Sequence, residues 1–393
     1  MSSYNFQDLG RFLRRSFWGN RETNYRLSLK RLGVVLLAAA VYLPVELVIW
    51  ISLGLDEIFF RGYRRVKVKE PVFIIGNPRS GTTFFHRLLS RDQENFISMK
   101  TWEIFLAPSV FLRKLIRGFA KIIRTLGIPL RGLLRRWERG LQEDNVFHKL
   151  RIRGPEEDEY LWIHIFSALK IWSFAAMLEE TDRYIYYDSQ MEPAGKKRMM
   201  DFYHACLQRH LYARRAEDVH YLAKNPNFSP MVDTLLKRYP GARFIYLVRN
   251  PLEAVSSHLS LKETEWQLLG NPLRAYASRD FILEASEHWY TYPLGRLEQL
   301  PREQYAVVKF EDLVENAHRT VTAVYRRLGL EMSEKYENIL KLETRRARRH
   351  SSEHEYSLAE MGLSPEGMRD RFAGIFERFD YQLHQQDQKK DSV

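Results

Sequence analysis

A glycine-containing turn at residues 76–83, with the sequence GNPRSGTT, constrains the fold of this chain more than any other feature. It follows a short apolar run at residues 71–75 (PVFII) and precedes a helical pattern that begins near Thr82. A strand, a turn and a helix in this order create an anion site, because backbone N–H groups converge there and the helix dipole favours negative charge. The turn therefore predicts an α/β fold that binds a phosphate-bearing ligand.

The turn differs from the loop of nucleotide triphosphatases. Gly76 and Gly81 have the spacing of the Walker A motif GxxxxGK[ST], but Thr82 stands where that motif has lysine. That lysine reaches the β- and γ-phosphates, so its replacement argues against ATP hydrolysis. Arg79 lies inside the turn instead, where it can face a single terminal phosphate or sulfate.

A second anion motif follows another apolar run, residues 242–248 (ARFIYLV), which predicts a buried strand. The strand ends in Arg249, where a Walker B strand would end in aspartate to hold Mg²⁺. The predicted helix that follows carries Ser256 and Ser257. An arginine with hydroxyls two turns on indicates a second anion pocket. Two such pockets without a metal ligand indicate that the ligand is a nucleotide phosphorylated at both ends.

The two motifs together resemble those of sulfotransferases that use 3′-phosphoadenosine-5′-phosphosulfate (PAPS). GNPRSGTTFFHRLL is similar to their 5′-phosphosulfate loop, and RFIYLVRNPLEAVSS to their 3′-phosphate motif. The resemblance covers residues 71 to about 381 and is greatest to the bacterial and tyrosylprotein-type branch. It implies transfer of a sulfuryl group from PAPS to an acceptor hydroxyl, with no metal. It also implies a P-loop sulfotransferase fold, an α/β fold with a mainly parallel central sheet flanked by helices.

The resemblance assigns roles to individual residues. Arg79 would contact the sulfate or the leaving oxygen, and Lys224 would neutralise charge on the transferring group. The remaining donor-binding residues would be Ser80, Gly81, Thr82, Thr83, Arg249, Ser257 and Ser352.

The expected general base is Glu103, because related sulfotransferases have a glutamate facing the acceptor shortly after the first helix. The acidic run at residues 156–159 (EEDE) and His86 are the alternatives. The run follows Gly154 and Pro155, so it also has the pattern of a helix start, where carboxylates stabilise the N-terminus without taking part in chemistry.

Two segments suggest contact with a membrane. The apolar run at residues 32–55, interrupted by Pro44 and Glu46, is long enough to span a bilayer. It is equally compatible with an element that enters one leaflet and with a helix packed on the core. Residues 104–137 have no acid and place basic residues among apolar ones at helical spacing, as in a helix on an anionic membrane surface. The alternative for this segment is a solvated basic face, to which Arg113, Lys114, Arg117, Lys121 and Arg124 would contribute.

Net charge and cysteine content indicate which partners and which cellular compartment to expect. The net charge of +12 suggests an anionic partner, but no nucleic-acid-binding module is recognisable, so no nucleic acid is expected. The single cysteine, Cys206, excludes an intrachain disulfide and favours a reducing compartment. The expected location is the cytoplasmic face of a bacterial inner membrane, with a Golgi type II membrane protein as the alternative.

The expected organisation has three parts. Residues 1–65 form a basic and apolar membrane-associated segment, residues 66–383 the sulfotransferase domain with 104–137 as a basic amphipathic insertion, and residues 384–393 a disordered tail. The acceptor is expected to be an amphiphilic lipid or glycan at the membrane. A P-loop small-molecule kinase would need an acid where Arg249 stands, and a non-catalytic membrane-bound adaptor would be expected to have lost motif residues that are present.

Overall fold

A five-stranded sheet, parallel throughout, forms the centre of the molecule in the computed structural model, which describes residues 3–18, 22–127, 132, 152–216, 218–347 and 357–382. The strand order is β2-β3-β1-β4-β5. The strands are β1 Val72–Gly76, β2 Phe96–Ile97, β3 His220–Lys224, β4 Arg243–Val248 and β5 Tyr305–Lys309. The predicted α/β fold with a mainly parallel sheet is therefore confirmed, and β1 and β4 lie where the two apolar runs predicted strands.

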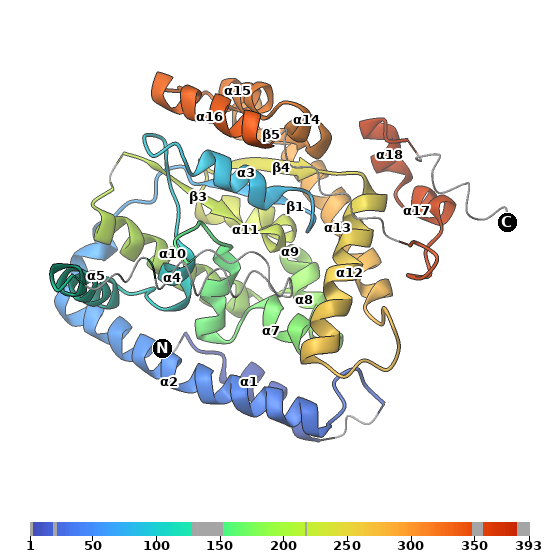
Figure 1. The fold of residues 1–393 in the computed structure, drawn as a ribbon, viewed down its shortest axis with the longest axis horizontal. Coiled ribbons are helices and arrows are strands. Elements are labelled where there is room, and N and C mark those ends of the chain that lie inside the picture. The colour runs from blue at the N-terminus through green and yellow to red at the C-terminus, as the bar shows by residue number, and fades with distance from the viewer. Residues whose placement is uncertain are drawn as a thin grey trace.

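Helices cover both faces of the sheet, because alternate side chains of the buried β1 point to opposite sides. Phe73 and Ile75 pack in one core, and Val72 and Ile74 in the other. In Figure 1 the second core lies beneath the upper layer of helices, and the first lies on the opposite side of the sheet. The upper layer consists of α3 Thr82–Leu89, α14 Phe310–Glu315, α15 Ala317–Arg327 and α16 Glu334–Ala347. The second layer, on the opposite face of the sheet, includes α10 Pro193–Arg214, α11 Val232–Arg238, α12 Pro251–Leu269 and α13 Arg279–Leu297.

Short helices complete the second layer and the C-terminal part of the fold. They are α4 Thr101–Phe105, α7 Leu169–Phe174, α8 Asp182–Ile185, α9 Tyr187–Gln190, α17 Pro365–Arg371 and α18 Ala373–Phe379. Helix α3 follows β1 after the loop of residues 77–81, and α12 follows β4 after residues 249–250, so both predicted anion motifs lie at the carboxyl edge of the sheet. That edge is where ligands bind in open α/β folds.

The N-terminal apolar run forms one long helix, α2 Leu29–Phe59, with Pro44 inside it. Among the described residues it is the only helix long and apolar enough to cross a membrane. In Figure 1, α2 lies along the lower side of the molecule against the second layer rather than projecting from it. Tyr42 donates to the Ile163 carbonyl (2.9 Å) and Trp50 Nε1 donates to the His164 carbonyl (3.0 Å), so side chains near its middle hold it to the body.

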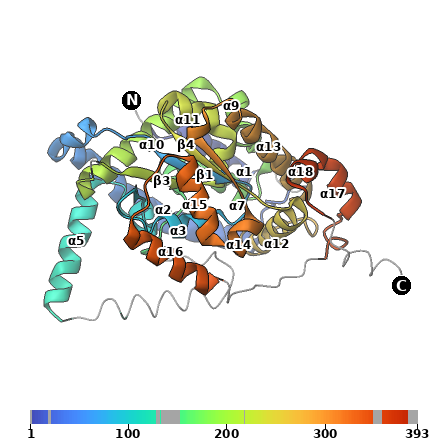
Figure 2. The same cartoon turned by 90° about the horizontal axis from the view of Figure 1, so that it is seen from above.

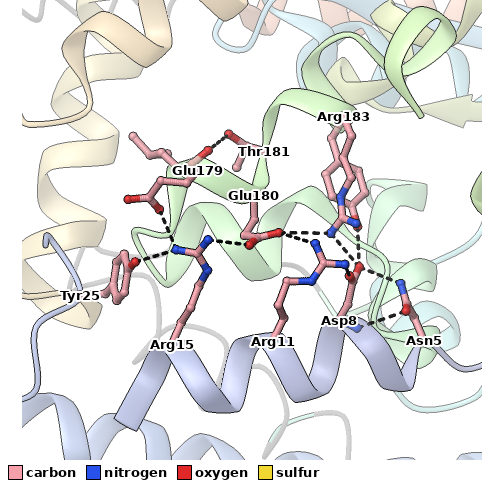
Figure 3. A network of polar contacts seen from close by, with 11 residues as sticks. Asn5, Asp8, Arg11, Arg15, Tyr25, Glu179, Glu180, Thr181 and Arg183 are labelled. Carbon is pink, nitrogen blue, oxygen red and sulfur yellow. Dashed lines mark hydrogen bonds and ion pairs between the residues drawn. The ribbon is translucent and has the colours of Figure 1, made fainter. Parts of the chain in front are cut away.

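Helix α1 Phe6–Phe17 is attached to the body by ion pairs, which Figure 3 shows. Arg11 and Arg15 both contact the Glu180 carboxylate, at 2.8 and 2.9 Å, and Arg183 contacts Asp8 at 2.9 Å. Glu180 and Asp8 are buried, so these contacts are shielded from solvent more than surface ion pairs are. Arg11 and Arg15 of α1 therefore neutralise carboxylates of the protein body.

Helix α5 Val110–Thr125 contains part of the predicted amphipathic segment, and Figure 2 shows it extending away from the body. Of the predicted residues 104–137, positions 128–131 and 133–137 lie outside the described residues. The sequence analysis offered a solvated basic face that would include Arg113, but the structure does not place Arg113 on such a face. It is fully buried, its Nε donates to the Ala107 carbonyl (2.6 Å), and its Nη1 lies 2.6 Å from His210 Nδ1.

Candidate active site

The loop between β1 and α3 has a backbone that requires glycine at two positions. Gly76 has φ 141° and Gly81 has φ 81°, both in the region that favours glycine. A Cβ atom on Gly76 would lie 2.3 Å from the Leu247 carbonyl oxygen, and one on Gly81 would lie 2.4 Å from Phe310 Cδ2. Arg79 also has a left-handed backbone (φ 69°), a costly conformation for a residue with a Cβ and one that clusters at functional sites.

Side chains join this loop to the second predicted anion motif. Arg79 Nε donates to Ser257 Oγ (2.8 Å), and Arg249 Nη1 donates to the Arg79 carbonyl (3.0 Å). The Arg249 guanidinium also lies over the Phe310 ring, 4.5 Å from its centroid. The two motifs, which are far apart in the sequence, therefore form one continuous cationic site. Phe310 was not predicted, although its position directly after β5 places it at the same carboxyl edge.

Arg249 has a carboxylate partner on its own helix. Both its Nε and its Nη2 donate to Glu253 Oε2, at 3.0 and 2.6 Å, one turn into α12. The arginine side chain retains 20% of its exposure, so a phosphate can approach it from solvent. This ion pair orients the guanidinium.

Lys224 is the last residue of β3. It pairs in register with Ile74 of β1. The lysine is almost completely buried. Its Nζ donates to Thr83 Oγ1 (3.1 Å) in the first turn of α3 and to Glu157 Oε1 (2.7 Å). A buried cation of this kind requires a counter-charge, which Glu157 supplies. Lys224 therefore lies beside the phosphate loop, and its role in neutralising charge on the transferring group stays a prediction.

The four acids of residues 156–159 have separate partners. Glu157 precedes the 3₁₀ helix Asp158–Ile165, so the predicted helix start is present, but its side chain does not cap that helix. Asp158 accepts hydrogen bonds from the hydroxyls of Tyr203 (2.7 Å) and Tyr221 (2.9 Å) in the core. Of the four, Glu157 is the one that contacts Lys224 directly.

Glu103 has different surroundings. Its side chain is fully buried, Oε1 lies 2.6 Å from Arg214 and 3.4 Å from Arg117, and Oε2 accepts from the Lys100 backbone N–H (2.9 Å). These contacts describe a carboxylate that caps α4 and neutralises two arginines. Its role as the general base remains a prediction, and this geometry does not favour it.

Two histidines near the site are held neutral. Burial and the positive charge of Lys224 lower the pKa of His86 to about 3, which makes it a weak base at neutral pH. Burial, together with Lys262, Lys170 and Arg79, lowers the pKa of His258 well below its usual range. His258 directly follows Ser257, so Lys170 and Lys262 add to the positive field around the predicted 3′-phosphate motif. Lys170 and Lys262 could not be predicted as site residues, because only the fold brings them to the site.

Other predicted site residues take positions consistent with an anion site. Ser80 and Thr82 are buried at the start of α3, where the helix dipole favours an anion. Ser352 lies outside the described residues. Within the described part of the chain, no group of three or more His, Cys, Asp or Glu side chains is arranged to hold a metal ion.

We expect Glu159 to make stability depend on pH. Burial raises the pKa of its carboxyl from 4.5 to about 7, although Lys170 opposes the shift. Between these values the folded protein retains a proton that the unfolded chain releases, so this contribution to the free energy of unfolding falls as pH rises from about 4.5 to about 7. Relative to wild type, Glu159→Gln should gain on the order of 1–3 kcal/mol between pH 5 and pH 8. Urea unfolding at several pH values measures this, and a difference that does not vary with pH would contradict it.

Comparison with known proteins connects this geometry to a family. Residues 71–334 match the model of the sulfotransferase family, and this stretch includes both anion motifs and Lys224. The chain belongs to the sulfotransferase family. The match covers more than half of the chain, so the membership predicted from the two motifs is confirmed.

Relatives of this sulfotransferase are found in mycobacteria. It is 26% identical over 267 residues to the omega-hydroxy-beta-dihydromenaquinone-9 sulfotransferase Stf3 of Mycobacterium bovis, and equally to that of Mycobacterium tuberculosis. The aligned region is 66% of this chain and 63% of each relative. The chain therefore matches less than two thirds of their length.

Solved structures share the fold. The crystal structure of sulfotransferase STF9 from Mycobacterium avium has a TM-score of 0.69 and 18% identity, covering 97% of this chain and 98% of that one. The structure of STF1 from Mycobacterium tuberculosis also has a TM-score of 0.69, with 20% identity over 94% of this chain and 92% of that chain. At these identities the likeness concerns the fold alone, and it confirms the predicted class.

Proposed function

We propose that this sulfotransferase transfers a sulfuryl group from PAPS to a hydroxyl of an apolar, membrane-soluble acceptor. The observation that carries the proposal is the contact of Lys224 with both Thr83 and Glu157. It places a buried cation and a carboxylate together at the start of the phosphate-loop helix. Sulfuryl transfer, like phosphoryl transfer, needs in-line geometry, cations on the moving oxygens and a base for the attacking hydroxyl.

The residues present fit a donor that is phosphorylated at both ends. The backbone amides at the start of α3, with Thr82 and Thr83, would hold the 5′-phosphate. Arg249 and Ser257 would hold the 3′-phosphate. Arg79 bridges the two ends, because its side chain contacts Ser257 while its backbone belongs to the loop. PAPS supplies an activated sulfuryl group, and the protein contributes positive charge where negative charge develops on the leaving phosphate.

Glu157 is our proposed general base, in place of Glu103. The acceptor oxygen would form the new S–O bond as the bond between sulfur and the 5′-phosphate oxygen breaks, and the acceptor proton would move to the Glu157 carboxylate. Lys224, now facing a neutral carboxyl, would direct its charge to the departing phosphate oxygen. The 2.7 Å contact between the two side chains couples these changes.

The acceptor class rests on two observations. The Stf3 relatives are named for a hydroxylated menaquinone derivative, an apolar substrate. In addition, α2 exposes an apolar surface of the kind that contacts lipid. The membrane location and a cytoplasmic orientation are part of this proposal.

Incubation with PAPS labelled with ³⁵S tests the reaction. One sample would contain a bacterial membrane lipid extract, and a second would contain water-soluble hydroxyl compounds such as p-nitrophenol and a tyrosine peptide. We expect label in a solvent-extractable product from the first sample only. Label in the soluble acceptors alone would contradict the acceptor class, and transfer to neither would count against the reaction.

A further inference from the structure

Helix α2 has its polar and apolar faces reversed relative to a helix on the surface of a soluble protein. Such a helix buries its apolar stripe and exposes its charges. In α2 all three acids face the protein instead. Glu46 Oε1 lies 2.7 Å from His164 Nδ1, Asp56 lies 3.0 Å from Arg209, and Glu57 lies 2.8 Å from Arg209.

The outward face of α2 is apolar along most of its length. Large apolar side chains that are more than half exposed recur at helical spacing from one end to the other, including Leu36, Leu37, Leu43, Leu47, Ile51 and Ile58. A continuous exposed apolar surface of this kind marks a site of contact with a partner or a membrane.

The inward contacts fix the direction of the helix. The contacts of Tyr42, Glu46, Trp50 and Asp56 extend over about half of α2 and hold it lengthwise against the body. A transmembrane orientation would carry the attached body into the bilayer or break each of these contacts. It would also place Glu46 in hydrocarbon without its histidine partner, which is costly. With α2 held in this way, its outer face can contact a membrane only if the helix lies parallel to the membrane surface.

Helix α5 adds positive charge next to this face. It contacts α2 near the C-terminal end of that helix, where Asp56 accepts hydrogen bonds from the backbone N–H groups of Val110 and Phe111, both 2.8 Å. Its exposed side chains combine apolar groups with cations, and α5 itself has no acid. They are Leu115, Phe119, Ile122 and Leu126 at its C-terminus, with Lys114, Lys121 and Arg124. Apolar and cationic groups on one projecting helix complement an anionic lipid surface.

We infer that the outer face of α2, together with α5, docks the enzyme onto one leaflet of an anionic membrane, with α2 parallel to the membrane plane. The apolar side chains enter about 5–10 Å into the interface between headgroups and acyl chains. The cations of α5 contact the anionic headgroups. This inference does not depend on the reaction proposed above, because it uses only the burial and charge of these two helices.

Flotation with lipid vesicles tests the docking surface. The vesicles would be phosphatidylcholine, with and without phosphatidylglycerol. Wild type should float with the vesicles, and more of it with the anionic ones. The double variant Leu43→Glu/Leu47→Glu should bind at least about tenfold more weakly, because two side chains leave the lipid and two charges are added. The matched control Leu342→Glu changes an exposed leucine of α16, on the opposite side of the molecule, and should float as wild type does.

Depth measurement distinguishes the in-plane helix from the other arrangements. Single cysteines at positions 36, 47 and 58, in a Cys206→Ser background, would carry a fluorophore that is quenched by nitroxide lipids. An in-plane helix predicts the same shallow depth for all three. A deep central label between shallow ends would indicate a span and overturn the inference. Dimers in light scattering without vesicle binding would also overturn it, because α2 would then cover a second copy. Melting temperature and titration with the product 3′-phosphoadenosine-5′-phosphate confirm that each variant is folded.

Discussion

Glu157→Gln should lower kcat by about 100- to 10,000-fold, the range lost when a general base is removed. The substitution keeps the shape of the side chain and removes its ability to accept the acceptor's proton. It also leaves Lys224 without its counter-charge, so the affinity for 3′-phosphoadenosine-5′-phosphate should be retained or increased. Single-turnover transfer of ³⁵S and calorimetric titration on the same preparation separate the two effects.

Glu103→Gln is the matched comparison, since it makes the same chemical change in another buried glutamate. It removes the charge that neutralises Arg214 and Arg117, so the melting temperature should fall while kcat of the folded protein stays close to that of wild type. The opposite pattern, with kcat lost in Glu103→Gln and retained in Glu157→Gln, would restore the assignment made from sequence.

Asp56→Ala should cost about 3–5 kcal/mol in the free energy of unfolding, the range found when one partner of a buried ion pair is removed. Asp56 is fully buried between Arg209 and the first backbone N–H groups of α5. Its loss leaves the buried Arg209 guanidinium with the partly exposed Glu57 as its remaining carboxylate partner, and two N–H groups without their acceptor. Urea unfolding followed by circular dichroism measures the change.

Asp218→Ala provides the control for this effect. Asp218 pairs with Lys69 at 2.6 Å, but its side chain is 86% exposed, so solvent screens the interaction. We expect no measurable change in stability. Equal losses for the two variants would show that the contacts around Asp56 do not hold α2 and α5 to the body.

The carboxyl edge of the sheet could be predicted from the sequence because its signals are local. Each anion motif combines a buried strand, a turn and a helix start within a few residues, so Arg79 and Arg249 could be placed before the fold was known. The chain brings Ser257 to Arg79 through a hydrogen bond between segments that are 178 residues apart, which no local pattern records. The family resemblance assigned both residues to the donor site but did not predict this hydrogen bond.

The acceptor side of the site could not be predicted in the same way. Glu157 and Lys224 are 67 residues apart, and their contact depends on how β3 pairs with β1. Glu103 was selected from its distance after the first helix, although its partner Arg214 lies at the end of α10. β2 has only two residues and β3 has a mixed sequence, so neither gave a strand pattern.

The N-terminal helix shows a further limit of pattern analysis. Glu46 inside an apolar run argued against a simple span. The face of α2 on which its side chain lies is toward His164, which is far along the chain and could not be identified from the pattern. Composition could not show that all three acids of α2 face the protein. That result required the fold, and from it we infer an orientation parallel to the membrane, which the depth measurement tests.

The most direct test of the central claim is calorimetric titration with 3′-phosphoadenosine-5′-phosphate, without Mg²⁺ and with ATP as the comparison. We expect binding of the bisphosphate that weakens by about 10- to 100-fold in Arg249→Ala, because charge-assisted hydrogen bonds to a phosphate are lost. The control Arg319→Ala, an exposed arginine of α15, should bind as wild type does. Binding of ATP in preference to the bisphosphate, or only with Mg²⁺, would contradict the account and favour a P-loop kinase.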